Sequence, residues 1–169
     1  MASLDILSPK GQQSLRDERD MLESLRRVFE SSGSSMQIVE TDKDTPCSVD
    51  GFLIKNGIIS GVFESKVRYM DRAKMRKYNN EWLVTFDKIN TGLQLSKILC
   101  VPFYGLLYLV HEPIGMMVHI GDEFGDPVAN MKVAQTTTSK TCNGGVITKA
   151  NAFIDIGNAF EFEIFKEVP

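Results

Sequence analysis

The sequence predicts one mixed α/β domain, in which a helix and three strands are followed by a second helix and a β-rich remainder. Three observations indicate this order: leucines at helical spacing near the N-terminus, an Asn-Gly pair between two strand-length runs, and a second helical pattern followed by a continuous apolar run. A chain of 169 residues with 43% hydrophobic and 24% charged residues suits a single globular domain. We expect a core over about residues 12–120 and a β-rich C-terminal extension over about residues 121–169.

The first half is predicted to begin with a helix over about residues 12–32, in which apolar side chains recur at helical spacing. These side chains are Leu15, Leu22, Leu25 and Phe29. Serines and Gly33 then end the helix. Three strands are expected next, at residues 36–41, 49–55 and 58–68. The second and third flank Asn56-Gly57, a pair typical of tight hairpins, so they should be antiparallel neighbours.

The second half is predicted to be richer in strands. Residues 70–80 are basic and indicate an exposed loop or a short helix. Residues 82–86 lead into a second helix over about residues 87–99, which Pro102 prevents from continuing. The apolar run 103–110 has the length of a strand covered on both faces, and residues 116–120 are its expected partner. Further strands are expected at residues 128–135, 145–156 and 160–166.

Two carboxylates and an ammonium group interrupt the apolar hairpin, at Asp50, Glu64 and Lys66. Glu64 and Lys66 are two residues apart on one strand and therefore share a face. A plain two-residue turn pairs Asp50 with Phe63 and places Asp50 on the opposite face. One bulge, or a loop longer or shorter by one residue, places Asp50 opposite Glu64. A shared site therefore requires an irregular hairpin, and the alternative is an ordinary solvated Glu–Lys pair.

These residue types suit phosphodiester hydrolysis, in which negative charge develops on the phosphate oxygens and on the leaving group. Carboxylates bind Mg²⁺, a hard cation that prefers oxygen ligands and keeps several waters. The metal polarises the phosphate and lowers the pKa of a bound water. A neighbouring lysine orients or deprotonates that water, or steadies the charge of the phosphate. We therefore expect Mg²⁺ as the cofactor, with Mn²⁺ able to replace it.

The sequence of Asp50, Glu64-Ser65-Lys66 and the surrounding elements resembles the PD-(D/E)XK nuclease superfamily, which includes restriction endonucleases, Holliday-junction resolvases and RecB-type nuclease domains. The resemblance covers about residues 12–120. It implies a restriction endonuclease-like core of helix, three-stranded antiparallel meander, helix and strand. It also implies that Asp50 and Glu64 bind metal and that Lys66 serves the water or the phosphate. The chain departs from the family pattern before Asp50, where Val49 stands in place of proline.

Both predicted helices carry further candidates. Glu18 lies on the apolar face of the first helix, where many members of the superfamily carry a metal-binding acid; the alternative is a glutamate paired with a nearby arginine. Asp17 and Glu23 face elsewhere and are expected at the surface. The resemblance implies that the second helix contributes a Lys or Gln to the active site, which indicates Lys88 as a catalytic residue and Gln94 as a weaker candidate. Ordinary surface polarity is the alternative for both.

A run of basic residues begins at the candidate catalytic lysine and extends over twelve positions. It consists of Lys66, Arg68, Arg72, Lys74, Arg76 and Lys77. Cations beside a phosphate-cleaving site suit binding of the DNA backbone, and two nearby tyrosines, Tyr69 and Tyr78, suit stacking on bases. A solvated loop is the alternative interpretation of this run.

The sequence thus predicts a magnesium-dependent deoxyribonuclease, with endonuclease activity favoured. The alternative is a catalytically inactive nuclease-fold module that binds nucleic acid or serves in an assembly, and the intact trio argues against it. The formal net charge of −3 requires that DNA binding depend on local patches. Three widely spaced cysteines predict free thiols, and neither a signal peptide nor a membrane span is recognisable, so we expect a cytoplasmic protein with DNA as its partner and no membrane contact. Whether the protein forms a homodimer is left open by the sequence.

Overall fold

The computed structural model describes residues 8–43, 45, 47–137 and 145–166, which form three helices and nine strands. The helices are α1 (Pro9–Ser31), α2 (Arg72–Lys77) and α3 (Phe86–Leu99). The strands are β1 (Met36–Glu40), β2 (Gly51–Lys55), β3 (Ile58–Arg68), β4 (Glu81–Thr85), β5 (Phe103–Leu109), β6 (Ile114–Gly121), β7 (Met131–Thr137), β8 (Thr148–Asp155) and β9 (Phe160–Glu163). The predicted mixed α/β class is confirmed.

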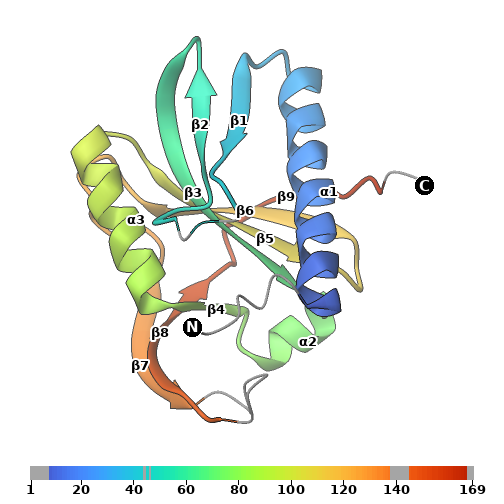
Figure 1. Ribbon diagram of the computed structural model, residues 1–169, viewed down its shortest axis with the longest axis vertical. Coiled ribbons are helices and arrows are strands. Elements are labelled where there is room, and N and C mark those ends of the chain that lie inside the picture. Colours follow the sequence, from blue (N-terminus) through green and yellow to red (C-terminus); the bar gives the residue numbers. More distant parts are fainter. Residues whose placement is uncertain (1–7, 44, 46, 138–144, 167–169) are drawn as a thin grey trace.

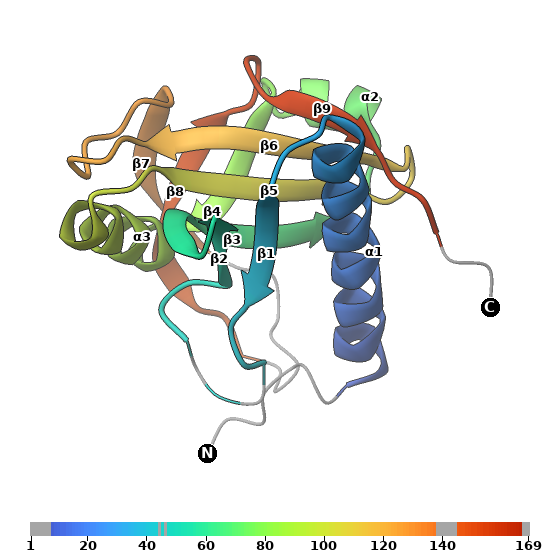
Figure 2. The ribbon, with the colours of Figure 1, turned by 90° about the horizontal axis from the view of Figure 1, so that it is seen from above.

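The strands form two sheets that pack with the long helices in layers (Figure 1). The larger sheet has six strands in the order β1-β2-β3-β5-β6-β9, and the smaller sheet has three in the order β4-β8-β7. Helix α1 covers one face of the larger sheet, while α3 lies on the other side (Figure 2). The smaller sheet packs on the same side as α3, because side chains of β4 and β8 share one apolar cluster with β5 and α3.

Helix α1 begins and ends at local sequence signals. The Ser8 hydroxyl accepts the backbone N–H of Gly11 at 3.0 Å, and Pro9 occupies the first helical turn. Gly33 follows the helix with a φ of +70°, a conformation that glycine adopts without a steric cost. The apolar face then packs fully buried residues, including Leu22 and Leu25, against the sheet.

The predicted hairpin irregularity is confirmed. Asn56 and Gly57 form the two-residue turn between β2 and β3, both with positive φ. Pairing then shifts by one residue, because Ile54 faces Ile59 whereas Leu53 faces Gly61. This bulge leaves Gly51 opposite Phe63, so the residue before it, Asp50, lies level with Glu64.

Strand β3 lies inside the fold and has neighbours on both edges and both faces. It pairs antiparallel with β2 on one edge and parallel with β5 on the other. The side chains of Phe63 and Val67 pack toward α1, whereas Val62 belongs to the cluster on the side of α3. Alternation along the strand therefore places Glu64, Lys66 and Arg68 on the side of α3.

One part of the fold differs from the expectation drawn from the sequence. Residues 81–85 form a strand in their own right, β4, rather than an approach to the second helix. The C-terminal residues are rich in strands, as predicted, and they complete both sheets, because β8 pairs with β4 and β9 adds to the edge of the larger sheet. Side-chain periodicity reports whether a segment is half-buried, but it does not report which distant strand it pairs with.

No helix of the described residues is long and apolar enough to cross a membrane. Cys47 and Cys100 are free thiols, as predicted, and Cys142 lies outside the described residues. Cys100 is exposed after the end of α3. Its backbone adopts a left-handed conformation there, with a φ of 53°.

Gly105 makes room for the largest side chain of the core. It pairs with Glu64 across β3 and β5, and a Cβ atom at this position would lie 2.2 Å from the ring of Trp82 and 2.8 Å from Ile120. Trp82 is almost completely buried, so its ring cannot move aside into solvent. The absence of a side chain at Gly105 therefore allows β4 to pack against the central strands.

We expect Gly105→Ala to lower the free energy of unfolding by about 1–3 kcal/mol, because overpacking must displace the Trp82 ring. Urea denaturation followed by tryptophan fluorescence measures the change. Gly157→Ala is the matched control, because a Cβ atom there approaches only the end of the Asp155 side chain, at 3.1 Å. Equal stability of the two variants would contradict this account of the packing.

Candidate active site

Glu64 is the most deeply buried acid of the site, with an exposed fraction of 0%. Its position on β3 encloses it between β2 and β5. Neither carboxylate oxygen has a hydrogen-bond partner among the described residues. Two ammonium groups lie close, with Lys66 Nζ at 3.1 Å from Oε1 and Lys88 Nζ at 3.4 Å from Oε2. The side chain thus provides a buried, charged acceptor whose compensation comes from two lysines.

Asp50 lies beside Glu64 because of the bulge in the hairpin. Its Oδ2 accepts the backbone N–H of Ser65 at 2.8 Å and lies 3.0 Å from the Ser65 hydroxyl. Its Oδ1 lies 4.0 Å from Lys88 Nζ, the same ammonium that contacts Glu64. The structure therefore brings Asp50 to the side of Glu64 and Lys66, as the sequence interpretation required.

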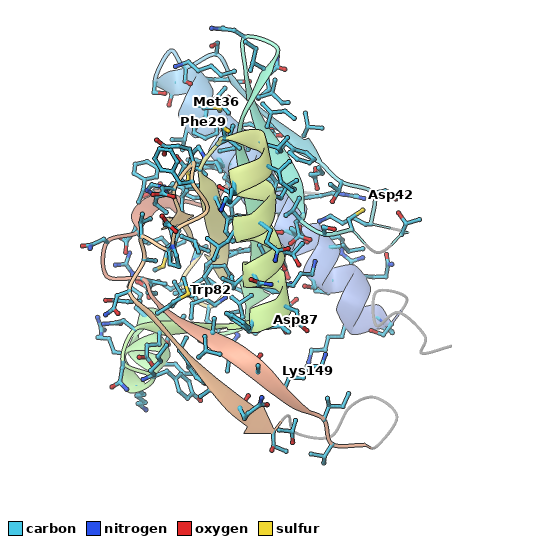
Figure 3. The ribbon with its side chains drawn as sticks, turned by 90° about the vertical axis from the view of Figure 1, so that its left-hand side faces the viewer. Phe29, Met36, Asp42, Trp82, Asp87 and Lys149 are labelled. Atoms are coloured by element: carbon cyan, nitrogen blue, oxygen red, sulfur yellow. The ribbon has the colours of Figure 1, made fainter. Side chains whose placement is uncertain are left out.

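Helices α1 and α3, which are both in view in Figure 3, supply the outer members of the site. Glu18 from α1 accepts a hydrogen bond from the Ser65 hydroxyl, as does Asp50. Because this hydroxyl has a single proton, the two carboxylates share one donor. Lys88 lies in the first turn of α3, next to the labelled Asp87, and donates to the carbonyl of Cys47 at 3.2 Å. The predicted positions of Glu18 and Lys88 at the site are thus found in the structure.

Two residues of the site were not predicted from the sequence. Lys43 Nζ lies 2.8 Å from Glu18 Oε1 and 3.8 Å from Asp50 Oδ1, and so bridges these acids. Ser65, the middle residue of Glu64-Ser65-Lys66, links Asp50 to α1 through its hydroxyl. Nothing in the local sequence distinguishes Lys43 from a lysine in a charged turn. Ser65 could have been found from strand alternation, which turns it toward α1.

The surface position predicted for Asp17 is wrong. Its exposed fraction is 2%, and its carboxylate accepts hydrogen bonds from Tyr69 at 2.8 Å and from Gln13 at 3.2 Å. Burial and the contact with Asp17 raise the pKa of Tyr69 to about 12. Tyr69 therefore points toward α1, away from the face that carries Glu64.

Gln94, the weaker candidate on the second helix, is exposed on α3, and none of the described contacts joins it to the site.

The predicted basic run divides among different surroundings. Arg68 shares the face of Glu64 and Lys66, and its guanidinium donates to the carbonyl of Leu83 at 2.9 Å. Arg72 is bonded to Glu112 at 3.2 Å and to Glu161 at 2.6 Å, so its charge is compensated within the fold. The remaining three, Lys74, Arg76 and Lys77, are exposed on α2.

Burial and charge shift the two facing acids in opposite directions. Burial raises the pKa of Glu64 above its ordinary value of 4.5, and the nearby charge of Asp50 adds to this rise. Burial also acts to raise the pKa of Asp50, but the charges of Lys66 and Lys43 and the Ser65 N–H outweigh it and lower that pKa. Asp50 is therefore the more strongly stabilised anion of the pair.

The carboxylates do not by themselves surround an ion. Among the described residues, no group of three or more His, Cys, Asp and Glu side chains is arranged to hold a metal. Asp50 and Glu64 nonetheless face the same ammonium group, and Mg²⁺ sites commonly use one or two carboxylates with the rest of the shell completed by water and substrate phosphates. The donor set fits a hydrated Mg²⁺ better than an ion that is enclosed by protein ligands.

Comparison of the chain with protein-family models, with curated proteins and with solved structures gives no match. The functional interpretation consequently depends on the residues and geometry described above.

We expect substitutions of the two acids to have opposite effects on stability at pH 7. The raised pKa of Glu64 means that the folded protein retains a proton that the unfolded chain releases above pH 4.5, so stability falls as pH rises through that window. Glu64→Gln removes this penalty and should raise the melting temperature at pH 7. The lowered pKa of Asp50 contributes stability above pH 3.8 that is lost as pH falls, so Asp50→Asn should cost about 1–3 kcal/mol at pH 7.

Urea denaturation of both variants at pH 7 and pH 4 measures these differences. At pH 4 Glu64 becomes protonated, so Glu64→Gln should move toward the wild-type stability, whereas the lowered pKa keeps Asp50 ionised, so Asp50→Asn should keep most of its deficit. A Glu64→Gln variant that is much less stable than wild type at pH 7 would show that Glu64 is a structural ion-pair partner.

Proposed function

We propose that this protein is a metal-dependent deoxyribonuclease of the PD-(D/E)XK type, which hydrolyses DNA phosphodiester bonds. One observation carries the proposal: the carboxylate of Glu64 is fully buried and faces Asp50, and among the described residues its close polar neighbours are the ammonium groups of Lys66 and Lys88. Burying a carboxylate without hydrogen bonds costs folding free energy, and such costs are typical of binding and catalytic sites. A divalent cation held by Asp50 and Glu64 would add to the compensation that the two lysines provide.

The order of elements supports the same proposal. Helix α1 and the antiparallel strands β1, β2 and β3 are followed, after α2 and β4, by helix α3 and strand β5, which apart from these two inserted elements is the order expected for a restriction endonuclease-like core. The acids and lysines come from the elements that this resemblance implies: Glu18 from α1, Asp50 before β2, Glu64 and Lys66 from β3, and Lys88 from α3.

Asp50 and Glu64 would hold Mg²⁺, or Mn²⁺ in its place. When bound, the metal supplies charge to the phosphate and lowers the pKa of a coordinated water. Lys66 is about one-third exposed, so its ammonium reaches solvent and can donate to the attacking water or to a phosphate oxygen. Lys88 bridges both acids and can steady the developing charge on the same side. Glu18 and Lys43 position Asp50, with Ser65 as the hydrogen-bonded link.

We expect Lys66→Ala to lower the cleavage rate by roughly 10²–10³-fold, because a preorganised donor to the transition state is lost. The assay uses linear, circular, single-stranded and branched DNA with Mg²⁺ or Mn²⁺. Asp50→Asn and Glu64→Gln should abolish cleavage. Lys97→Ala, at the far end of α3, is the matched control and should keep wild-type turnover. Near wild-type turnover of Lys66→Ala on every DNA would exclude Lys66 from catalysis, and a wild-type protein that binds these DNAs without cleaving any would favour a non-catalytic module.

Metal binding gives a second test that does not require turnover. Mg²⁺ at 100 times its Kd should stabilise the wild-type protein by about 2.7 kcal/mol, because the ion binds only the folded state. Thermal unfolding with Mg²⁺, compared with KCl at the same ionic strength, measures this shift. Glu64→Gln should lose the shift while staying folded. Binding should also weaken as pH falls through the raised pKa of Glu64, because protons compete with the metal. A shift unchanged in Glu64→Gln would place the ion elsewhere.

A further inference from the structure

A pocket of about 440 Å³ opens further along the strand that carries Glu64 and Lys66. Its walls are mostly apolar, and these lining residues are Met70, Met75, Trp82, Leu83 and Phe153. The volume falls in the range of roughly 300–1,000 Å³ that is typical of small-ligand sites. The residues that line this pocket make none of the described contacts that hold the proposed active site together. Arg68 only shares a strand face with Glu64 and Lys66.

Cations without acidic partners surround these apolar walls. Arg68, Lys74 and Lys77 line the pocket, and none of them forms an ion pair with a described residue. Burial lowers the pKa of Arg68, and no carboxylate in the part of the chain that the structure describes offsets this shift. The acid in this lining, Glu81, is bonded to Lys132 at 2.7 Å, so it does not neutralise the arginine. The pocket therefore offers positive charge to an anionic ligand.

An exposed aromatic ring stands at the same pocket. Tyr78 caps the end of α2 and has an exposed fraction of 54%, although it is part of the lining. Asn79 and Asn80 both have positive φ and turn the chain from α2 into β4, which carries Trp82 (Figure 3). The indole N–H of Trp82 is buried without an acceptor among the described residues. Aromatic surface, apolar walls and unpaired cations thus meet in one place.

We propose that this pocket binds an unpaired nucleotide of the DNA strand that is cleaved, so the substrate class is single-stranded, overhanging or branched DNA rather than continuous duplex. This inference rests on the proposed function, because the nuclease assignment is what directs the bound DNA strand toward Glu64. A nucleotide matches both parts of the lining, because its base packs on aromatic and apolar side chains and its phosphate pairs with cations. A base within duplex DNA must leave its stack before it can enter a pocket.

The spacing along β3 allows one strand to occupy both places. Arg68 lies four residues after Glu64 on the same face, roughly 13 Å along the strand direction. Lys66 lies between them and contacts Glu64. A DNA strand running along β3 would therefore place one phosphate at the acids and a nearby unpaired nucleotide of the same strand at Arg68.

The test measures binding without cleavage, using the full-length wild-type protein in EDTA. Fluorescein-labelled dT15 and a duplex of the same length are titrated by anisotropy, and emission of Trp82, the one tryptophan of the chain, is followed with unlabelled DNA. The single strand should bind at least about tenfold more tightly than the duplex, because base stacking adds to the phosphate contacts. It should also change the Trp82 emission, while the duplex should not.

Substitutions at the pocket should act on the single strand. Tyr78→Ala should weaken single-strand binding about tenfold, and Lys74→Ala should reduce the slope of log affinity against log salt by about 0.7. Phe124→Ala and Lys55→Ala are the matched controls, because these residues are an exposed aromatic and an exposed cation outside the pocket. Lys74 is exposed on α2 and Tyr78 is exposed at the end of this helix, and circular dichroism checks that their variants stay folded.

Three outcomes would overturn the proposal: equal affinity for single strand and duplex, equal effects of the pocket variants and their controls, or binding of free dTMP as tight as that of dT15, which would make the ligand a free nucleotide. The proposed function fails separately. If single-strand binding depends on Tyr78 but no DNA is cleaved with Mg²⁺ or Mn²⁺, the pocket stands as a nucleotide site while the nuclease assignment falls.

Discussion

The burial of Glu64 on the central strand is the constraint on which the rest of the site depends. A carboxylate without hydrogen bonds in the interior is tolerated only when cations lie close enough to compensate its charge. Lys66 from the same strand and Lys88 from α3 provide that compensation at 3.1 and 3.4 Å. The first turn of α3 carries one of these two ammonium groups, so the packing of α3 against β3 decides how close that charge lies to Glu64.

A single bulge connects this constraint to the second carboxylate. Without the shift between Leu53 and Ile54, Asp50 would face away from Glu64. With the shift, Asp50 reaches the backbone of Ser65, and the Ser65 hydroxyl extends the network to Glu18 on α1. The two long helices on opposite sides of the sheet thus meet the same few polar groups at the strand ends. Apolar packing of α1 and α3 consequently helps to position groups that belong to four separate segments of the chain.

The smaller sheet forms part of the pocket that lies next to this site. Strand β4 is held against the larger sheet because Gly105 leaves room for the ring of Trp82. The same arrangement forms the pocket whose edge is lined by Arg68. The positive charge of this region coexists with a net charge of −3, because unpaired cations gather on one face while others, such as Arg72, are neutralised by glutamates. Local pairing, and not the total charge, decides where an anionic strand can bind.

Periodicity and turn chemistry within short segments predict the mixed α/β class, the positions of α1, β3 and α3, and the candidacy of Asp50, Glu64 and Lys66. The place of Lys43 in the site, the burial of Asp17 beside Tyr69 and the pairing of β4 with β8 come instead from contacts between distant segments. The physical reason is the same in each case. Local patterns specify which face of an element is apolar, whereas contacts between distant segments depend on how those faces pack, and no local pattern encodes that packing.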